Sequence, residues 1–179
     1  MTATATASDS PAVDSREVEI TLGDRIAGKY MAFKLAHEEY GLEILKVREI
    51  IGLMDITRVP GTSAFIRGVI NLRGKVHPVV DLRLKFGMER IEATDQTVII
   101  VVQCVYQGQE LTMGILVDEV LEVLNIDANQ IEPPPDFGGD ASSTEFILGV
   151  GKSDGRVIFL LDIGKVLTSE AGQALAWAD

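Results

Sequence analysis

Apolar and polar residues alternate along several short segments of the chain, which predicts β-strands. The alternation starts at Val18, Ile20 and Leu22 and continues into a predicted strand over Lys29–Leu35. A β-branched run without alternation, Thr97–Tyr106, predicts a strand buried on both faces. Short strands at close spacing are typical of a mainly β protein, here with a few short helices.

Further strands are predicted between turn signals rich in glycine, proline and aspartate. They are Tyr40–Val47, Phe65–Asn71, Lys75–Val80, Leu111–Val117, Phe146–Gly151 and Arg156–Leu161. Short helices are predicted where an aspartate can cap an apolar stretch, Leu82–Phe86 after Asp81 and Ile163–Leu167 after Asp162. Asp127 and Gln130 have the spacing of a capping box, which predicts one further helical turn.

One supersecondary unit occurs twice. The segment 65–82, FIRGVINLRGKVHPVVDL, returns as 146–163, FILGVGKSDGRVIFLLDI, at a constant offset of 146 − 65 = 81. A second pair of segments, 41–50 and 114–123, matches more weakly at an offset of 114 − 41 = 73. Ungapped matches of this length indicate that both halves of the chain follow one structural plan.

The duplicated β pattern predicts two small β-barrels packed together within residues 19–168. The repeats suggest a first barrel at about 28–90 and a second at about 92–168. Residues 1–18, rich in Thr, Ala and Ser, are expected to be a disordered leader, because they have too few apolar side chains to form a core. Residues 169–179 are expected to be a C-terminal tail.

Charge and composition exclude several classes of protein. The net charge of −11 argues against non-specific nucleic-acid binding, which needs clustered Lys and Arg. The single cysteine, Cys104, excludes an internal disulfide and is expected to be a buried thiol in a reducing compartment. No signal peptide or membrane-length apolar run is present, so a cytoplasmic protein without membrane insertion is expected.

The residues that could carry chemistry do not form a pattern typical of catalysis. The two histidines, His37 and His77, have no spacing that suggests a zinc site or a proton relay. An acidic group, Asp118, Glu119 and Glu122, is expected to be a solvated face. The sequence therefore predicts a protein that is not an enzyme, with no catalytic residue, no metal and no cofactor.

The two repeats differ at a predicted hairpin turn. The first has Asn71, Leu72 and Arg73, where the second has Lys152-Ser153-Asp154. The fold therefore does not require Arg73, whose rigid fork of donors suits carboxylates or carbonyls of a partner. A local salt bridge on the surface remains the alternative interpretation.

Each half also has more apolar residues after its predicted strands than one small barrel can enclose. These are Val47, Ile50, Ile51, Leu53 and Met54 in the first half, and Val117, Val120, Val123 and Leu124 in the second. Most are expected in the core or in the seam between barrels. A contiguous exposed group of them would mark a protein-binding groove.

Three segments resemble the bacterial chemotaxis coupling protein family, CheW. They are ILKVREI at 44–50, TRVPGTSAFIRGVINLRGKVHPVVDLRLKFG at 57–87 and ILVDEVLEVL at 115–124. The resemblance runs from about Tyr30 to Leu167 in order, and GVINLRG is its most specific part. It implies two five-stranded SH3-like barrels side by side.

The resemblance also implies a function. Members are non-enzymatic adaptors that link the cytoplasmic tips of transmembrane chemoreceptors to the regulatory domain of the histidine kinase CheA, in arrays at the membrane. Matched by position, the kinase-binding residues are Val47, Glu49 and Gly68, and the receptor-binding residues are Arg73, Val98 and Val123. Gly149 and Glu122 mirror Gly68 and Glu49 in the second half, so a scaffold role for this glycine and glutamate stays open.

Three alternatives remain at this point. The chain could serve a related chemosensory pathway that controls pili or development. It could be the regulatory domain of a kinase, although no ATP-binding motif is present. A small-molecule-binding barrel would need an enclosed pocket with converging polar groups, which the sequence does not indicate.

Overall fold

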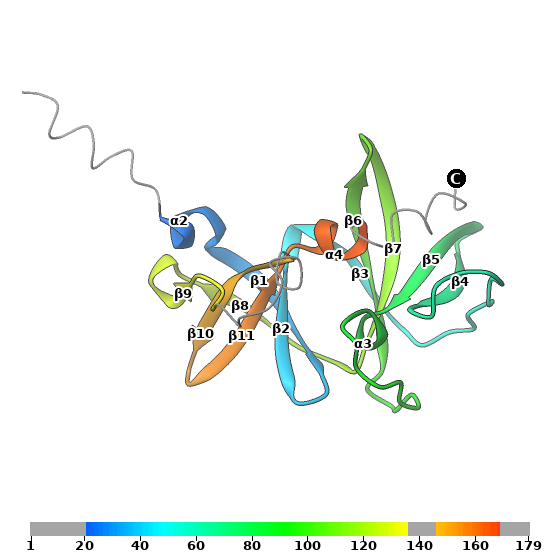
Figure 1. The fold of residues 1–179 in the computed structure, drawn as a ribbon, viewed down its shortest axis with the longest axis horizontal. Helices are drawn as coiled ribbons and strands as arrows, with labels where there is room; N and C mark the ends of the chain where they lie inside the picture. Colours follow the sequence, from blue (N-terminus) through cyan, green and yellow to red (C-terminus); the bar gives the residue numbers. More distant parts are fainter. Residues whose placement is uncertain (1–20, 136–145, 169–179) are drawn as a thin grey trace, which may run out of the picture.

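The computed structural model describes residues 21–135 and 146–168 (Figure 1). The predicted leader at 1–18 and tail at 169–179 lie outside the described residues. The strands are β1 (Gly28–Leu35), β2 (Glu38–Glu43), β3 (Val47–Gly52), β4 (Ile66–Leu72), β5 (Lys75–Asp81), β6 (Val98–Tyr106), β7 (Gln109–Val117), β8 (Glu119–Ile126), β9 (Ile131–Glu132), β10 (Ile147–Ser153) and β11 (Arg156–Leu161). The helices are α2 (Leu22–Ile26), α3 (Leu82–Lys85) and α4 (Ile163–Thr168), with single 3-10 turns η1 (Ile44–Lys46) and η2 (Ala128–Gln130).

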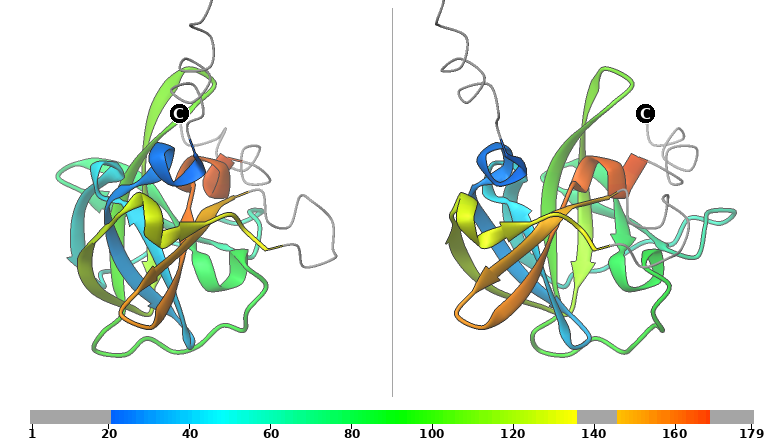
Figure 2. Two further views of the ribbon diagram at one scale, coloured as in Figure 1. Left: turned by 90° about the vertical axis from the view of Figure 1, so that its left-hand side faces the viewer. Right: turned by 60° about the vertical axis from the view of Figure 1, so that its left-hand side comes forward.

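The described strands form two sheets that lie side by side, with α4 between them (Figure 1). Barrel A is the six-stranded sheet β8-β1-β2-β11-β10-β9, and barrel B is the five-stranded sheet β3-β6-β7-β5-β4. The prediction of a duplicated, mainly β protein with two small barrels is confirmed. Figure 2 shows the same pair from two further sides.

The two barrels exchange strands. Strands β1 and β2 pair with β8 and β11 of the second half, whereas β6 and β7 pair with β3 and β5 of the first half. The predicted barrels at 28–90 and 92–168 are therefore wrong, although these ranges do delimit the two repeats. Because the repeats follow one plan, a strand can pair equally well within its own copy or with the other, and the sequence match does not distinguish the two arrangements.

The largest group of buried apolar side chains among the described residues, the seam core, lies where the barrels meet. Alternate residues of β1 and β6 contribute to it from opposite sides: Met31, Phe33 and Leu35 from β1, and Ile100, Val102 and Cys104 from β6. Residues of β6 between these, Ile99 and Val101, fill the interior of barrel B. The prediction that β6 is buried on both faces is confirmed, and burial raises the pKa of the Cys104 thiol, as expected for a structural cysteine.

The repeated hairpins β4-β5 and β10-β11 end in the same way. The amide of Asp81 donates to the carbonyl of Phe65 at 2.7 Å, and that of Asp162 donates to Phe146 at 2.8 Å. The carboxylate of Asp81 caps α3, and Oδ1 of Asp162 accepts from the amide of Lys165 at 3.1 Å. Both predicted caps are confirmed, which explains why the aspartate recurs in the two copies.

Two predicted segments differ from the structure. Leu22 begins helix α2 and does not continue a strand, because Thr21 and Asp24 form a reciprocal capping box. The predicted strand Tyr40–Val47 ends at Glu43, where the turn η1 carries the chain from barrel A to barrel B. Strands β3 and β8, which follow the two transitions between barrels, were not predicted as strands.

Barrel B closes where the chain after β3 meets β4. Thr57 and Val69 exchange two backbone hydrogen bonds, of 2.9 and 2.8 Å. Gly68 makes this approach possible: its φ is 140°, and a Cβ there would lie 2.1 Å from the carbonyl oxygen of Thr57. Barrel A closes in the equivalent way, through β9 and β10, with Gly149 against Glu132.

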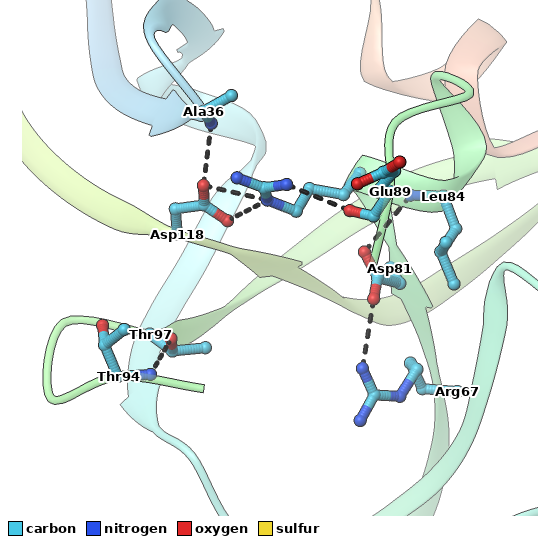
Figure 3. Close-up of polar contacts among 9 residues, drawn as sticks. Ala36, Arg67, Asp81, Leu84, Glu89, Thr94, Thr97 and Asp118 are labelled. Carbon is cyan, nitrogen blue, oxygen red and sulfur yellow. Dashed lines mark hydrogen bonds and ion pairs between the residues drawn. The ribbon is translucent and has the colours of Figure 1, made fainter. Parts of the chain in front are cut away.

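A carboxylate joins the barrels beside the seam. Asp118, between β7 and β8, accepts from the amide of Ala36 in barrel A at 2.7 Å (Figure 3). It also accepts from Nε of Arg83 at 2.8 and 3.0 Å, and both side chains are mostly buried. Arg83 in turn donates to the carbonyl of Glu89 at 3.0 Å. This clamp joins the β1-β2 turn to the point between β7 and β8 where the chain passes from one barrel to the other. Its contact with Arg83 is charge-assisted and therefore stronger than a neutral hydrogen bond.

We expect Gly68→Ala to destabilise the protein by about 3 kcal/mol, because the new Cβ overlaps a backbone carbonyl in a conformation that favours glycine. Gly52→Ala is the matched control, since no atom lies within 4 Å of its Cβ position, and its effect should stay within about 0.5 kcal/mol. Urea unfolding of both variants measures this. Equal stability of the two variants would show that the Thr57 contact does not constrain Gly68.

We expect Asp118→Ala to lower the free energy of unfolding by about 2–3 kcal/mol, because it leaves Nε of Arg83 and the amide of Ala36 without an acceptor. Asp118→Asn keeps an oxygen for Ala36 and should cost less. The exposed Asp95 supplies the surface control, Asp95→Ala. If the Asp118 and Asp95 variants unfold at the same urea concentration, the clamp contributes nothing to stability.

Candidate protein-binding surface

The described residues contain no cluster of three or more potential metal ligands. None of the described helices is long and apolar enough to cross a membrane. The acidic group expected to be a solvated face is partly engaged, which corrects that prediction. Asp118 forms the clamp with Arg83, and Glu122 pairs with Arg156.

Arg73 and Glu49 form a two-pronged ion pair on barrel B. Two guanidinium nitrogens of Arg73 donate to the two carboxylate oxygens of Glu49, at 2.8 and 3.0 Å. The hydrogen bonds from Arg73 lower the pKa of the Glu49 carboxyl from its usual value. The pair joins the β4-β5 turn to β3, so a residue predicted to bind the receptor contacts one predicted to bind the kinase.

Arg73 occupies an unusual backbone position. Its φ is 53°, in the left-handed region that arginine seldom adopts, and Asp154 occupies the same position in the other hairpin with a φ of 51°. Aspartate tolerates this conformation better because its short side chain can bond locally. The Arg73 side chain is 75% exposed, so the turn presents a cation to solvent at some conformational cost.

Barrel A holds its equivalent glutamate differently. Glu122 corresponds to Glu49 at the offset of 73, but its partner is Arg156, which also pairs with Glu39. The Arg156 side chain is 29% exposed, and the two carboxylates raise its pKa. Barrel A therefore engages its arginine between two acids, whereas barrel B leaves Arg73 largely exposed on a single acid.

The other two predicted kinase-binding residues lie on different strands of barrel B. Val47 begins β3, is partly buried and packs against the seam core. Gly68 is buried on β4, where its contact with Thr57 gives it a structural role. Val47 and Glu49 therefore share strand β3, whereas Gly68 lies on β4, where it permits the contact with Thr57 that closes the barrel.

The predicted receptor-binding residues are distributed over both barrels. Val98 begins β6 of barrel B, pairs with Gly52 and Val117, and is partly buried against the seam core. Val123 lies on β8 of barrel A and is 51% exposed. A partner that contacts both valines must therefore extend across the junction of the two barrels.

Sequence reasoning missed the most exposed large apolar residue. Leu45, in the turn η1 that connects the barrels, is 91% exposed. It borders a hollow of about 340 Å³ that Tyr30 and Ile44 also line. At the offset of 73 its counterpart is Asp118, so comparison of the copies could have identified Leu45 as specific to one half.

Comparison with known proteins agrees with this architecture. A family model described as CheW-like domain matches residues 29–171. The chemotaxis protein CheW of Klebsiella aerogenes is 42% identical over 83% of this chain and 86% of its own length. The CheW protein of Rhizobium meliloti is 38% identical over 80% of this chain and 90% of its own length.

A solved structure and a differently named relative extend the comparison. The scaffolding protein TtCheW from Thermoanaerobacter tengcongensis has a TM-score of 0.68 and 38% identity, covering 79% of this chain and 93% of that one. Protein FrzA of Myxococcus xanthus is 32% identical over 83% of this chain and 90% of its own length. The duplicated barrels, the family match and these relatives together show that the chain belongs to the CheW family of chemotaxis scaffold proteins.

Proposed function

We propose that this protein is an adaptor that couples the cytoplasmic tips of transmembrane chemoreceptors to the histidine kinase CheA. It would act in the cytoplasm, within arrays at the membrane. The observation that carries the proposal is the exposed Arg73–Glu49 pair, which barrel A does not reproduce. A cation kept in a strained turn and largely open to solvent suits a contact with a partner.

The kinase would bind along β3. Glu49 offers a charged acceptor, and Ile50, the next residue, is 42% exposed. Val47 precedes them on the same strand. A short edge strand with two charged residues, Arg48 and Glu49, and an exposed isoleucine suits docking against the regulatory domain of CheA, with the charges setting the orientation.

The receptor would bind across the barrel junction. Arg73 supplies donors at one end, and Val98 and Val123 supply apolar contacts on barrels B and A. A helical receptor tip would present apolar and polar side chains at helical spacing, which fit such a mixed surface.

A related pathway that controls pili or development is the second candidate. The resemblance to Protein FrzA of Myxococcus xanthus supports it. The same adaptor geometry would serve either pathway, so the receptors that recruit the protein distinguish the two.

We expect Arg73→Ala to remain folded and to lose receptor-dependent activation of the kinase, because the residue is exposed and the other hairpin forms without an arginine there. The assay is co-sedimentation with membranes that contain chemoreceptors, with and without CheA, with kinase autophosphorylation measured in parallel. Asp154→Ala changes the same turn position in barrel A and is the control. Wild-type activation by Arg73→Ala would contradict the proposed receptor contact.

We expect Glu49→Gln to weaken recruitment of CheA at least as much as receptor binding, because the charge on β3 is lost while the shape is kept. The double exchange Glu49→Arg with Arg73→Glu can re-form the ion pair with its polarity reversed. Binding isotherms for each partner should stay weakened in the double variant. Full recovery of both would mean that the pair acts only through the fold.

A further inference from the structure

Three arginines surround a second hollow on barrel B, on a protein with 27 acidic residues and 16 Lys and Arg. The hollow has a volume of about 250 Å³, and its cationic lining comes from Arg58, Arg67 and Arg90. None of the described residues that line it is an aspartate or glutamate. Such a local excess of cations attracts an anion, since field lines concentrate in a concave site.

An ion pair with Asp81 orients the side chain of Arg67. One of its terminal nitrogens lies 3.1 Å from Oδ2 of Asp81, whose side chain is 5% exposed. Figure 3 shows the other terminal nitrogen pointing away from Asp81. Asp81 therefore orients the guanidinium through one side and leaves donors of Arg67 for a ligand.

The second repeat shows that the fold does not require this arginine. Leu148 occupies the position of Arg67 at the offset of 81, and Asp162 caps α4 in barrel A with no ion pair to an arginine among the described residues. The aspartate is thus part of the common scaffold, whereas Arg67 is specific to barrel B.

The loop after β3 adds one neutral donor, the hydroxyl of Ser63. Thr62 donates from its hydroxyl to the carbonyl of Val59 at 2.9 Å, which fixes the turn at Pro60 and Gly61. The hydroxyl-bearing Ser63 lines the same hollow and is exposed. Hydroxyl and guanidinium donors around one small space form a typical setting for a tetrahedral oxyanion.

A larger pocket adjoins the hollow lined by the three arginines. It has a volume of about 480 Å³ and shares Arg67 and Arg90 with the smaller hollow. Its wall includes the apolar side chains of Leu53 and Ile91, which are 46% and 44% exposed. Three acids, Asp81, Glu92 and Asp118, line this pocket together with three arginines, so its charge is balanced. The excess of cationic over acidic lining residues belongs to the smaller hollow.

We propose that the smaller hollow binds a phosphate group, either free or carried by a small organic molecule whose body occupies the larger pocket. Of the three guanidinium groups only that of Arg67 has an acidic partner among the described residues, Asp81, so the remaining positive charge matches a phosphate dianion better than a single carboxylate. This site includes none of the residues proposed to contact the kinase or the receptor. The phosphate proposal is therefore independent of the proposed adaptor function.

The test is a titration of the ¹⁵N-labelled protein at constant ionic strength, followed by amide chemical shifts. We expect inorganic phosphate to cause saturable shifts in residues 56–67 and 90, and none in α2. Arg90→Ala, Arg58→Ala and Arg67→Leu should each weaken binding by about tenfold, the loss of one charge-assisted contact. Arg25→Ala, an exposed arginine on α2 of barrel A, is the control and should bind as the wild type does.

Two further ligands separate the sources of the phosphate and test its chemistry. Tighter binding of phenyl phosphate than of inorganic phosphate would support an organic ester whose body contacts Leu53 and Ile91. Equal affinity would support free phosphate as the ligand. Shifts that do not saturate, that are unchanged by Arg90→Ala, or that acetate reproduces at the same concentration would overturn the proposal.

Discussion

The pairing of β1 with β8 and of β3 with β6 is the interaction on which the rest of the structure depends. Each pair joins one repeat to the other, so neither barrel is complete without strands from both halves of the chain. The seam core follows from this exchange, because β1 and β6 present alternate side chains to it from opposite sides. Separating the barrels would require breaking strand pairs as well as exposing the seam, which makes the double barrel one cooperative unit.

The exchange also explains why the candidate binding residues lie where the chain crosses or closes. The turn η1, with the exposed Leu45, is the first crossing, and Asp118 stands at the second. The closure of barrel B brings β3 next to the β4-β5 turn, and this places Glu49 beside Arg73. Strand pairs on both sides constrain these positions, which suits the proposed role of a scaffold that holds partners in a defined geometry.

The two copies share one structural plan but differ chemically at equivalent positions. The caps at Asp81 and Asp162 are the same, but Arg67 and Leu148 differ above them. The turn positions Arg73 and Asp154 share a backbone conformation and differ in charge. The protein therefore has two similar barrels with chemically different surfaces, and it can present different faces to different partners.

The sequence alone determined the strands of the repeated hairpins, the aspartate caps, the mainly β class and the two-sided burial of β6. These features depend on local turn chemistry and on periodicity, which neighbouring residues specify. Only the tertiary structure decided which copy each strand joins, because equivalent strands of two repeats carry equivalent patterns. It also decided the partners of Glu49 and Asp118, which come from segments distant in the chain. The structural role of Gly68 also emerges only in the tertiary structure. The carbonyl of Thr57, which leaves no room for a side chain at Gly68, approaches the glycine only when barrel B closes.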